Sequence, residues 1–178
     1  MTFLVFLLAL LPALTSAWVK EMENDGLYQG DMILTPDQME QAKKGEYTFG
    51  SIKDKMWPTN IAYDYHSSLI NEPGAHRAVQ AAIDEYEKYT CLRFKRRTTE
   101  TTYMFFYLGR GCSSYVGMKT GQNWISLAGG CWSRSTTIHE IGHSLGKKIS
   151  ILFHSNIITL ISFILSNAVL STSSQCLF

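Results

Sequence analysis

The alternation of apolar and polar positions predicts strands and helices in the middle of the chain. Ile61, Tyr63 and Tyr65 recur with a period of two, which predicts a half-buried strand. Over residues 75–89 the apolar positions follow helical spacing, with charged residues on the opposite side, and this pattern predicts a helix. Pro73, just ahead of this helix, suits a first turn, where no amide donor is needed.

Shorter segments complete the pattern. Aromatic and β-favouring residues predict further strands over 91–94, 103–108 and 124–127. A second helix is predicted to begin near Thr136, which is an acceptable cap, and a short helix is predicted over 37–44. The middle of the chain is therefore expected to mix strands with helices.

The first seventeen residues predict a secretory signal peptide. An apolar run over 3–14 is followed by the small residues Thr15-Ser16-Ala17, which suit a cleavage site before Trp18. The run is too short to span a bilayer as an anchor. We therefore expect a secreted, extracellular protein.

Composition excludes some classes of function. The chain has 178 residues, 46% of them apolar and 17% charged, and its net charge is +1. These values allow one packed domain, and no basic stripe indicates a nucleic-acid partner. The four cysteines favour disulfides in an oxidising compartment, and because no CxxC pair occurs, a cysteine-based zinc site is not expected.

The pentapeptide His139-Glu140-Ile141-Gly142-His143 is the strongest chemical signal in the chain. Positions i and i+4 lie on one face of a helix, so both imidazoles can reach one metal ion, and zinc accepts imidazole nitrogen readily. Glu140 can then hold a zinc-bound water and take its proton as the general base. The alternative is a helix with two ordinary histidines, but the apolar Ile141 and Leu145 indicate a buried helix instead.

The sequence does not supply an obvious third zinc ligand. No Asp or Glu follows Glu140, so a downstream carboxylate ligand is excluded. Gly146 stands where a chain turns sharply from such a helix towards a third histidine, but the position expected for that histidine is Ile149.

Further short motifs accompany this pentapeptide. They are Tyr28-Gln29-Gly30-Asp31, Trp57-Pro58, Cys91-Leu92-Arg93-Phe94, the segment 111–117, Gly121-Gln122, Ile125-Ser126-Leu127, Gly130-Cys131 and the segment 137–146. In their order and spacing they resemble the astacin family of zinc metalloendopeptidases. The resemblance runs from about Tyr28 to Gly146.

The resemblance implies the fold and the activity. It implies an α+β fold, the upper subdomain of an astacin-like zincin, with a twisted mixed sheet and two long helices and with the C-terminal subdomain missing. It implies Zn²⁺ as cofactor, hydrolysis of extracellular proteins or peptides, and a pro-segment over 18–50 ahead of the catalytic part over 51–146. An extended substrate would add to an exposed sheet edge near Cys112, Ser113 and Ser114.

The resemblance also assigns roles to individual residues. Asp31 would bind the zinc from the pro-segment in place of water and hold the enzyme latent. Cys112 and Cys131 match a family disulfide. Cys91 matches a cysteine whose family partner lies in the missing half, so either Cys176 replaces that partner or Cys91 stays unpaired.

The segment 147–178 departs from the family pattern. From Ile149 to the end of the chain it contains no Asp, Glu, Lys or Arg, which makes it an unrelated apolar tail. We interpret it as translated intron sequence; a membrane anchor over 149–170 is the rival interpretation, and membrane contact is expected only in that case. Because half of the cleft is missing, a truncated, non-catalytic secreted module is the alternative to an active endopeptidase.

Overall fold

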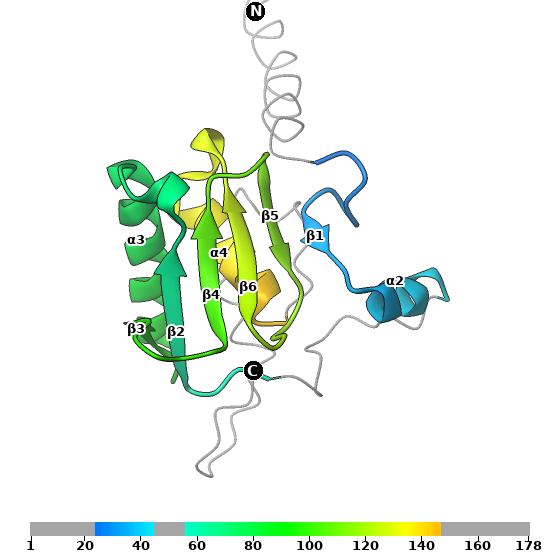
Figure 1. Ribbon diagram of the computed structural model, residues 1–178, viewed down its shortest axis with the longest axis horizontal. Helices are drawn as coiled ribbons and strands as arrows, with labels where there is room; N and C mark the ends of the chain where they lie inside the picture. The colour runs from blue at the N-terminus through cyan, green and yellow to red at the C-terminus, as the bar shows by residue number, and fades with distance from the viewer. Residues whose placement is uncertain (1–23, 45–55, 147–178) are drawn as a thin grey trace, which may run out of the picture.

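A six-stranded mixed sheet forms the centre of the computed structural model, which describes residues 24–44 and 56–146 (Figure 1). The strands, in chain order, are β1 (Met32–Ile33), β2 (Asn60–Tyr65), β3 (Arg93–Arg96), β4 (Tyr103–Tyr107), β5 (Cys112–Tyr115) and β6 (Gln122–Leu127). Their order across the sheet is β1-β5-β6-β4-β2-β3. Only β5 and β6 pair in antiparallel fashion; the other neighbours are parallel.

Two long helices cover one face of this sheet, and a third, shorter helix lies beyond its β1 edge (Figure 1). These are α3 (Pro73–Tyr89) and α4 (Arg134–Ser144) behind the sheet, and α2 (Pro36–Lys43) beside it. Single turns of 3-10 helix, η1 (Ser67–Leu69) and η2 (Gly129–Cys131), complete the elements. The predicted α+β fold with a mixed sheet and two long helices is confirmed.

The core lies between the sheet and the two long helices. Alternate strand residues such as Ile61, Phe106 and Ile125 point into it, and α3 contributes the apolar stripe that its helical spacing predicted. From α4, Ile138 and Ile141 enter the same core and are at most 1% exposed. Burial of this apolar surface on both layers is the main favourable contribution to folding.

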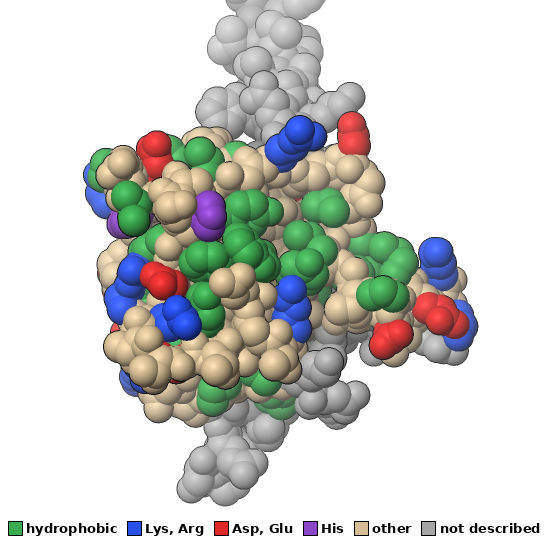
Figure 2. All heavy atoms as spheres, in the orientation of Figure 1, with side chains coloured by type: hydrophobic (Ala, Val, Ile, Leu, Met, Phe, Trp, Pro, Cys, Tyr) green, Lys and Arg blue, Asp and Glu red, His purple; other side chains and the backbone are tan. Residues whose placement is uncertain are grey.

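The outer face of the sheet carries half-buried aromatic rings. Phe105 and Tyr107 of β4 pack edge-to-face against Trp124 of β6, with ring centroids 4.8 and 5.2 Å apart. Figure 2 shows hydrophobic side chains gathered over β4, β6 and β5 on this face. Cross-strand aromatic pairs of this kind stabilise the central strands of a sheet.

Several boundaries differ from the sequence predictions. The second helix begins at Arg134 and is capped by Ser133, whose Oγ accepts the N–H of Thr136, so the expectation that Thr136 is the cap is wrong. The hydroxyl of Ser133 thus satisfies the N–H of Thr136, which has no partner inside the helix because it lies in the first turn. The hydrophobic pattern did not predict β1 and β5, because both are short and their residues are polar or irregular in period, although the resemblance implied a sheet edge near Cys112.

The cysteines form disulfides in the described part of the chain. Cys112 of β5 is bonded to Cys131 of η2, as the resemblance implied, with Cα atoms 5.7 Å apart. Cys91 is also disulfide-bonded, so the alternative that it stays unpaired is wrong. The Cys112–Cys131 bond therefore ties β5 to the turn that leads into α4.

Three predictions concern segments outside the described residues. These are the signal peptide over 1–17, the apolar tail over 147–178 with Cys176 in it, and the boundary of the pro-segment near residue 50. Within residues 24–44 and 56–146, no helix is both long and apolar enough to cross a membrane.

Candidate metal centre

The helix α4 carries the predicted zinc-binding motif and is buried from Thr136 to its last residue, Ser144. His139, Glu140 and His143 are each at most 1% exposed. A short helix that is buried over most of its length is held by the elements packed against it rather than by its own propensity. The positions of its side chains therefore depend on contacts with α3, with the sheet and with the segment before the sheet.

Hydrogen bonds to its backbone fix α4 along its length. The buried Tyr86 hydroxyl on α3 donates to the carbonyl of Ile138, at 2.9 Å. Trp57 donates its indole N–H to the carbonyl of Ser144, at 2.7 Å. The N–H of Gly117 donates to the carbonyl of His143, at 3.0 Å. Both ends of the motif are thus anchored from outside the helix.

Asp31 reaches the two histidines from a segment 108 residues earlier in the chain. It follows a tight turn in which Gln29 and Gly30 have φ values of 53° and 87°, a region that glycine enters without steric cost. An antiparallel bridge between Tyr28 and Met32 closes this turn. The side chain of Asp31 is directed towards α4 and is 4% exposed.

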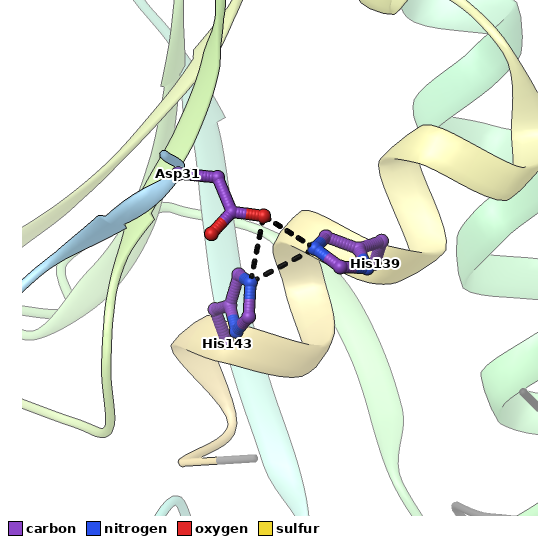
Figure 3. A group of neighbouring side chains, drawn as sticks. All are labelled: Asp31, His139 and His143. Carbon is purple, nitrogen blue, oxygen red and sulfur yellow. Dashed lines mark hydrogen bonds and ion pairs between the residues drawn. The ribbon is translucent and has the colours of Figure 1, made fainter. Parts of the chain in front are cut away.

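The three side chains converge on one point (Figure 3). Asp31 Oδ2 lies 2.7 Å from His139 Nε2 and 3.4 Å from His143 Nε2. The two Nε2 atoms are 2.9 Å apart, with the ring planes at 83° to each other. Each residue offers one ligand atom to a common centre.

Burial and charge shift the ionisation of the two carboxylates in opposite directions. Burial alone would raise the pKa of Asp31, but hydrogen bonds and charge from His139 and His143 outweigh it and lower the pKa to about 2. Burial raises the pKa of Glu140 well above its ordinary value, and the negative charge of Asp31 raises it further. The shift of Glu140 shows that its carboxyl group lies within electrostatic reach of Asp31 in the protein interior.

These residues fit a zinc ion. Tetrahedral zinc with nitrogen ligands at about 2.0–2.1 Å separates two such ligands by about 3.3 Å. In this structure the three ligand atoms lie 2.7 to 3.4 Å from one another. The spacing that zinc requires therefore falls near the upper end of the observed distances. Asp31 Oδ1 and Glu140 Oε2 are buried and have no hydrogen-bond partner among the described residues. A divalent cation would compensate the buried negative charge.

The expected substrate edge is not exposed in this form of the chain. Cys112, Ser113 and Ser114 are at most 3% exposed, because β1 occupies the outer edge of β5. Met32 pairs with Ser114, whose N–H donates to the carbonyl of Asp31 at 3.0 Å. The chain's own earlier segment thus takes the hydrogen bonds that an added strand would need.

Sequence reasoning missed two residues that attach this segment. Asn24 donates its side-chain amide to the carbonyl of Cys112, at 3.0 Å, and Gln38 donates to the carbonyl of Val116, at 2.9 Å. Gln38 also closes a capping box with Thr35, and the order Thr-Pro-Asp-Gln is a recognisable signature of such a box. No local pattern reveals the long-range contact of either amide.

A His-Glu-x-x-His helix packed behind a mixed sheet, with its histidines converging on a metal-binding point, defines the upper half of a zincin-type metallopeptidase. The family model of the astacin peptidases matches residues 50–156. The chain belongs to the astacin family, and the metal of this family is zinc, in agreement with the donor set.

Individual relatives support this membership. The chain is 31% identical over 128 residues to zinc metalloproteinase nas-6 of Caenorhabditis elegans, a match that covers 71% of this chain and 37% of that protein. It is 35% identical over 136 residues to blastula protease 10 of Paracentrotus lividus, covering 67% of this chain and 22% of that protein.

Among solved structures the chain is similar to high choriolytic enzyme 1, a hatching enzyme zinc-protease of Oryzias latipes. For that structure the TM-score is 0.50 and the identity 29%, over 55% of this chain and 51% of that one. The chain thus spans well under two thirds of the length of these relatives.

Proposed function

We propose that this chain is the latent form of a zinc-dependent metalloendopeptidase, held inactive by Asp31. The observation that carries this proposal is the convergence of Asp31 Oδ2 with the Nε2 atoms of His139 and His143, at 2.7 and 3.4 Å. Membership of the astacin family supports the reaction class. The two disulfide-bonded positions Cys112 and Cys131 support action in an oxidising, extracellular compartment.

His139 and His143 would hold the zinc ion, and Asp31 would complete the ligand set while the pro-segment is in place. When bound, zinc supplies a Lewis acid that polarises a carbonyl group and makes a water molecule more acidic. The buried carboxylate of Glu140, next to His139 on the same helix, accepts the proton of the attacking water and later donates it to the leaving amine. This double role requires the group to hold the proton only at an intermediate stage, between the attack of water and the departure of the amine.

Latency would have two parts. Asp31 occupies the position at the two histidines that a water molecule needs, and β1 occupies the edge of β5 where an extended peptide would add. We place Asp31 and β1 in a pro-segment over 18–50, ahead of a catalytic part over 51–146. Removal of the pro-segment would expose both positions together, and the substrate edge over Cys112, Ser113 and Ser114 would become available.

A non-catalytic secreted module is the second candidate function. The observation that favours it is Ile149 at the position where the family pattern has its third histidine. Two imidazoles and a removable carboxylate would then bind zinc only while Asp31 stays in place.

Zinc content and cleavage distinguish the two candidates. The whole purified chain is dialysed and its zinc measured by atomic absorption, and peptide cleavage is then followed after limited proteolysis of the pro-segment. We expect one zinc per chain, and cleavage that disappears in Glu140→Ala while the zinc remains. A chain that retains zinc until the pro-segment is removed, then loses it and cleaves nothing, would contradict the enzyme and support the binding module.

A further inference from the structure

The helix α2 is attached to the rest of the protein although none of its residues is fully buried. It is only eight residues long, and helices of this length are marginal in water without tertiary contacts. Hydrophobic burial is therefore a small part of what holds it in place. Its attachment depends on a side-chain contact instead.

That contact is made by the side-chain amide of Gln38, whose oxygen accepts one hydrogen bond while its nitrogen donates another. Its Oε1 accepts the N–H of Thr35 at 2.8 Å, which closes the capping box at the start of α2. Its Nε2 donates to the carbonyl of Val116 at 2.9 Å, in the segment that follows β5. A glutamate at this position would close the same capping box but has no donor for the carbonyl of Val116.

The carbonyl of Val116 belongs to the same peptide group as the N–H of Gly117. That N–H donates to the carbonyl of His143 at 3.0 Å, in the last turn of α4. One planar peptide group therefore receives a hydrogen bond from α2 on one side and gives one to the backbone of a histidine of the metal centre on the other. Hydrogen bonds arranged in series through a peptide group polarise and strengthen each other.

The local backbone allows this peptide group to change its orientation. Gly117 has a φ of +77°, a conformation that residues with a side chain rarely adopt. Glycine can leave this conformation at little steric cost, so the orientation of the group depends on its two hydrogen bonds. Loss of either bond would loosen the other.

We infer that Gln38 is a positioning residue that couples α2, through the peptide group between Val116 and Gly117, to the end of α4 that carries His143. Gln38 thereby forms a second link between the N-terminal segment and the metal centre, separate from the contact of Asp31 with the histidines. Departure of the segment changes the backbone at the metal centre as well as freeing the histidines. The inference rests on the proposed function only in treating 24–44 as a removable pro-segment.

Hydrogen exchange of single backbone amides tests this coupling in the whole, metal-free chain. In Gln38→Glu the N–H of Gly117 should exchange about tenfold faster, because the bond to Val116 is lost and a carboxylate faces its carbonyl. The N–H of Met39, which donates to the carbonyl of Thr35 within α2, should keep its rate, because glutamate preserves the capping box. Gln41→Glu, the same change at an exposed position of α2, should leave both rates unchanged.

Equal exchange at Gly117 in Gln38→Glu and Gln41→Glu would overturn the inference. Equal acceleration at Met39 and Gly117 in Gln38→Glu would also overturn the inference, since Gln38 would then act only through the stability of α2. Thr35→Ala provides a second variant that leaves the amide of Gln38 intact but loosens the start of α2, which carries Gln38: it should accelerate both Met39 and Gly117. An unchanged rate at Gly117 in Thr35→Ala, with Met39 accelerated, counts against the coupling, even if Gln38→Glu does not fold.

These measurements need neither zinc nor a substrate. A chain that proves unable to bind zinc or to cleave peptides would contradict the proposed function and leave the exchange result standing. Conversely, an unchanged exchange rate at Gly117 in Gln38→Glu would contradict the coupling and would not bear on the proposed role of Glu140.

Discussion

At the scale of single residues, the chemistry of the candidate metal centre depends on atoms that face one another in a dry interior. Asp31, His139 and His143 are each at most 3% exposed, so their mutual attraction is weakly screened by solvent. The carboxylate of Asp31 has lost its hydration, and the two imidazoles are its compensation. Such a residue is costly to bury unless it has partners, and a metal ion would serve as one.

Asp31→Asn should lower the affinity of the whole chain for zinc by at least about tenfold, because an amide is a poor substitute for a carboxylate ligand. A competition titration with a chromophoric chelator measures this change. Asp25→Asn, the same substitution on an exposed residue of the same segment, serves as the control. Equal zinc affinity in the two variants would show that Asp31 does not bind the metal.

At the scale of elements, the position of α4 is set by its neighbours. The hydroxyl of Tyr86 crosses from α3 to the carbonyl of Ile138, immediately before the first histidine of the motif. Burial raises the pKa of this hydroxyl well above its ordinary value, so Tyr86 remains a neutral donor at all moderate pH. The contact therefore joins the two long helices and orients the motif at once.

Tyr86→Phe should reduce the free energy of unfolding by about 1 kcal/mol, since one buried hydrogen bond is lost while the ring still fills its place. Urea denaturation followed by circular dichroism measures the change. The matched variant Tyr89→Phe alters a residue that is 41% exposed on the same helix and should leave the midpoint nearly unchanged. Identical midpoints for both variants would argue against a stabilising role of the Tyr86 hydroxyl.

At the scale of the whole molecule, the candidate metal centre joins two parts of the chain that are distant in sequence. The segment 24–44 contributes Asp31 and the strand β1, and the part from residue 56 onward contributes α4 and the other five strands. Zinc bound between them would connect both parts in the folded state only. Binding to the folded state alone raises its stability by mass action.

Zinc at a free concentration of about one hundred times its dissociation constant should therefore raise the free energy of unfolding by about 2.7 kcal/mol. Differential scanning calorimetry would show this as a higher melting temperature, reversed by a chelator. His139→Ala should abolish the zinc-dependent shift. His76→Ala, which removes the contact of His76 Nε2 with the carbonyl of Leu69, should lower the melting temperature itself and keep the shift.

Elements with a repeated hydrophobic period were predictable from the sequence. The helix over 75–89 was predicted within two residues of its start, because its apolar stripe repeats over several turns. The strands over 61–65 and 103–108 were likewise placed within one residue at each end. Short polar strands such as β5 were missed, since four residues with two serines carry no period.

The sequence by itself determined the chemistry of this protein: a His-Glu-x-x-His helix, zinc as its metal and a family with one characteristic order of motifs. These are local features, because i and i+4 spacing on a helix brings two imidazoles to one face without further information. The family resemblance implied that Asp31 reaches the metal from the pro-segment. Only the tertiary structure decided how close Asp31 lies to His139 across 108 residues, that β1 covers the edge of β5, and that Gln38 reaches Val116. Such contacts depend on how distant segments pack together, and no local periodicity encodes that packing.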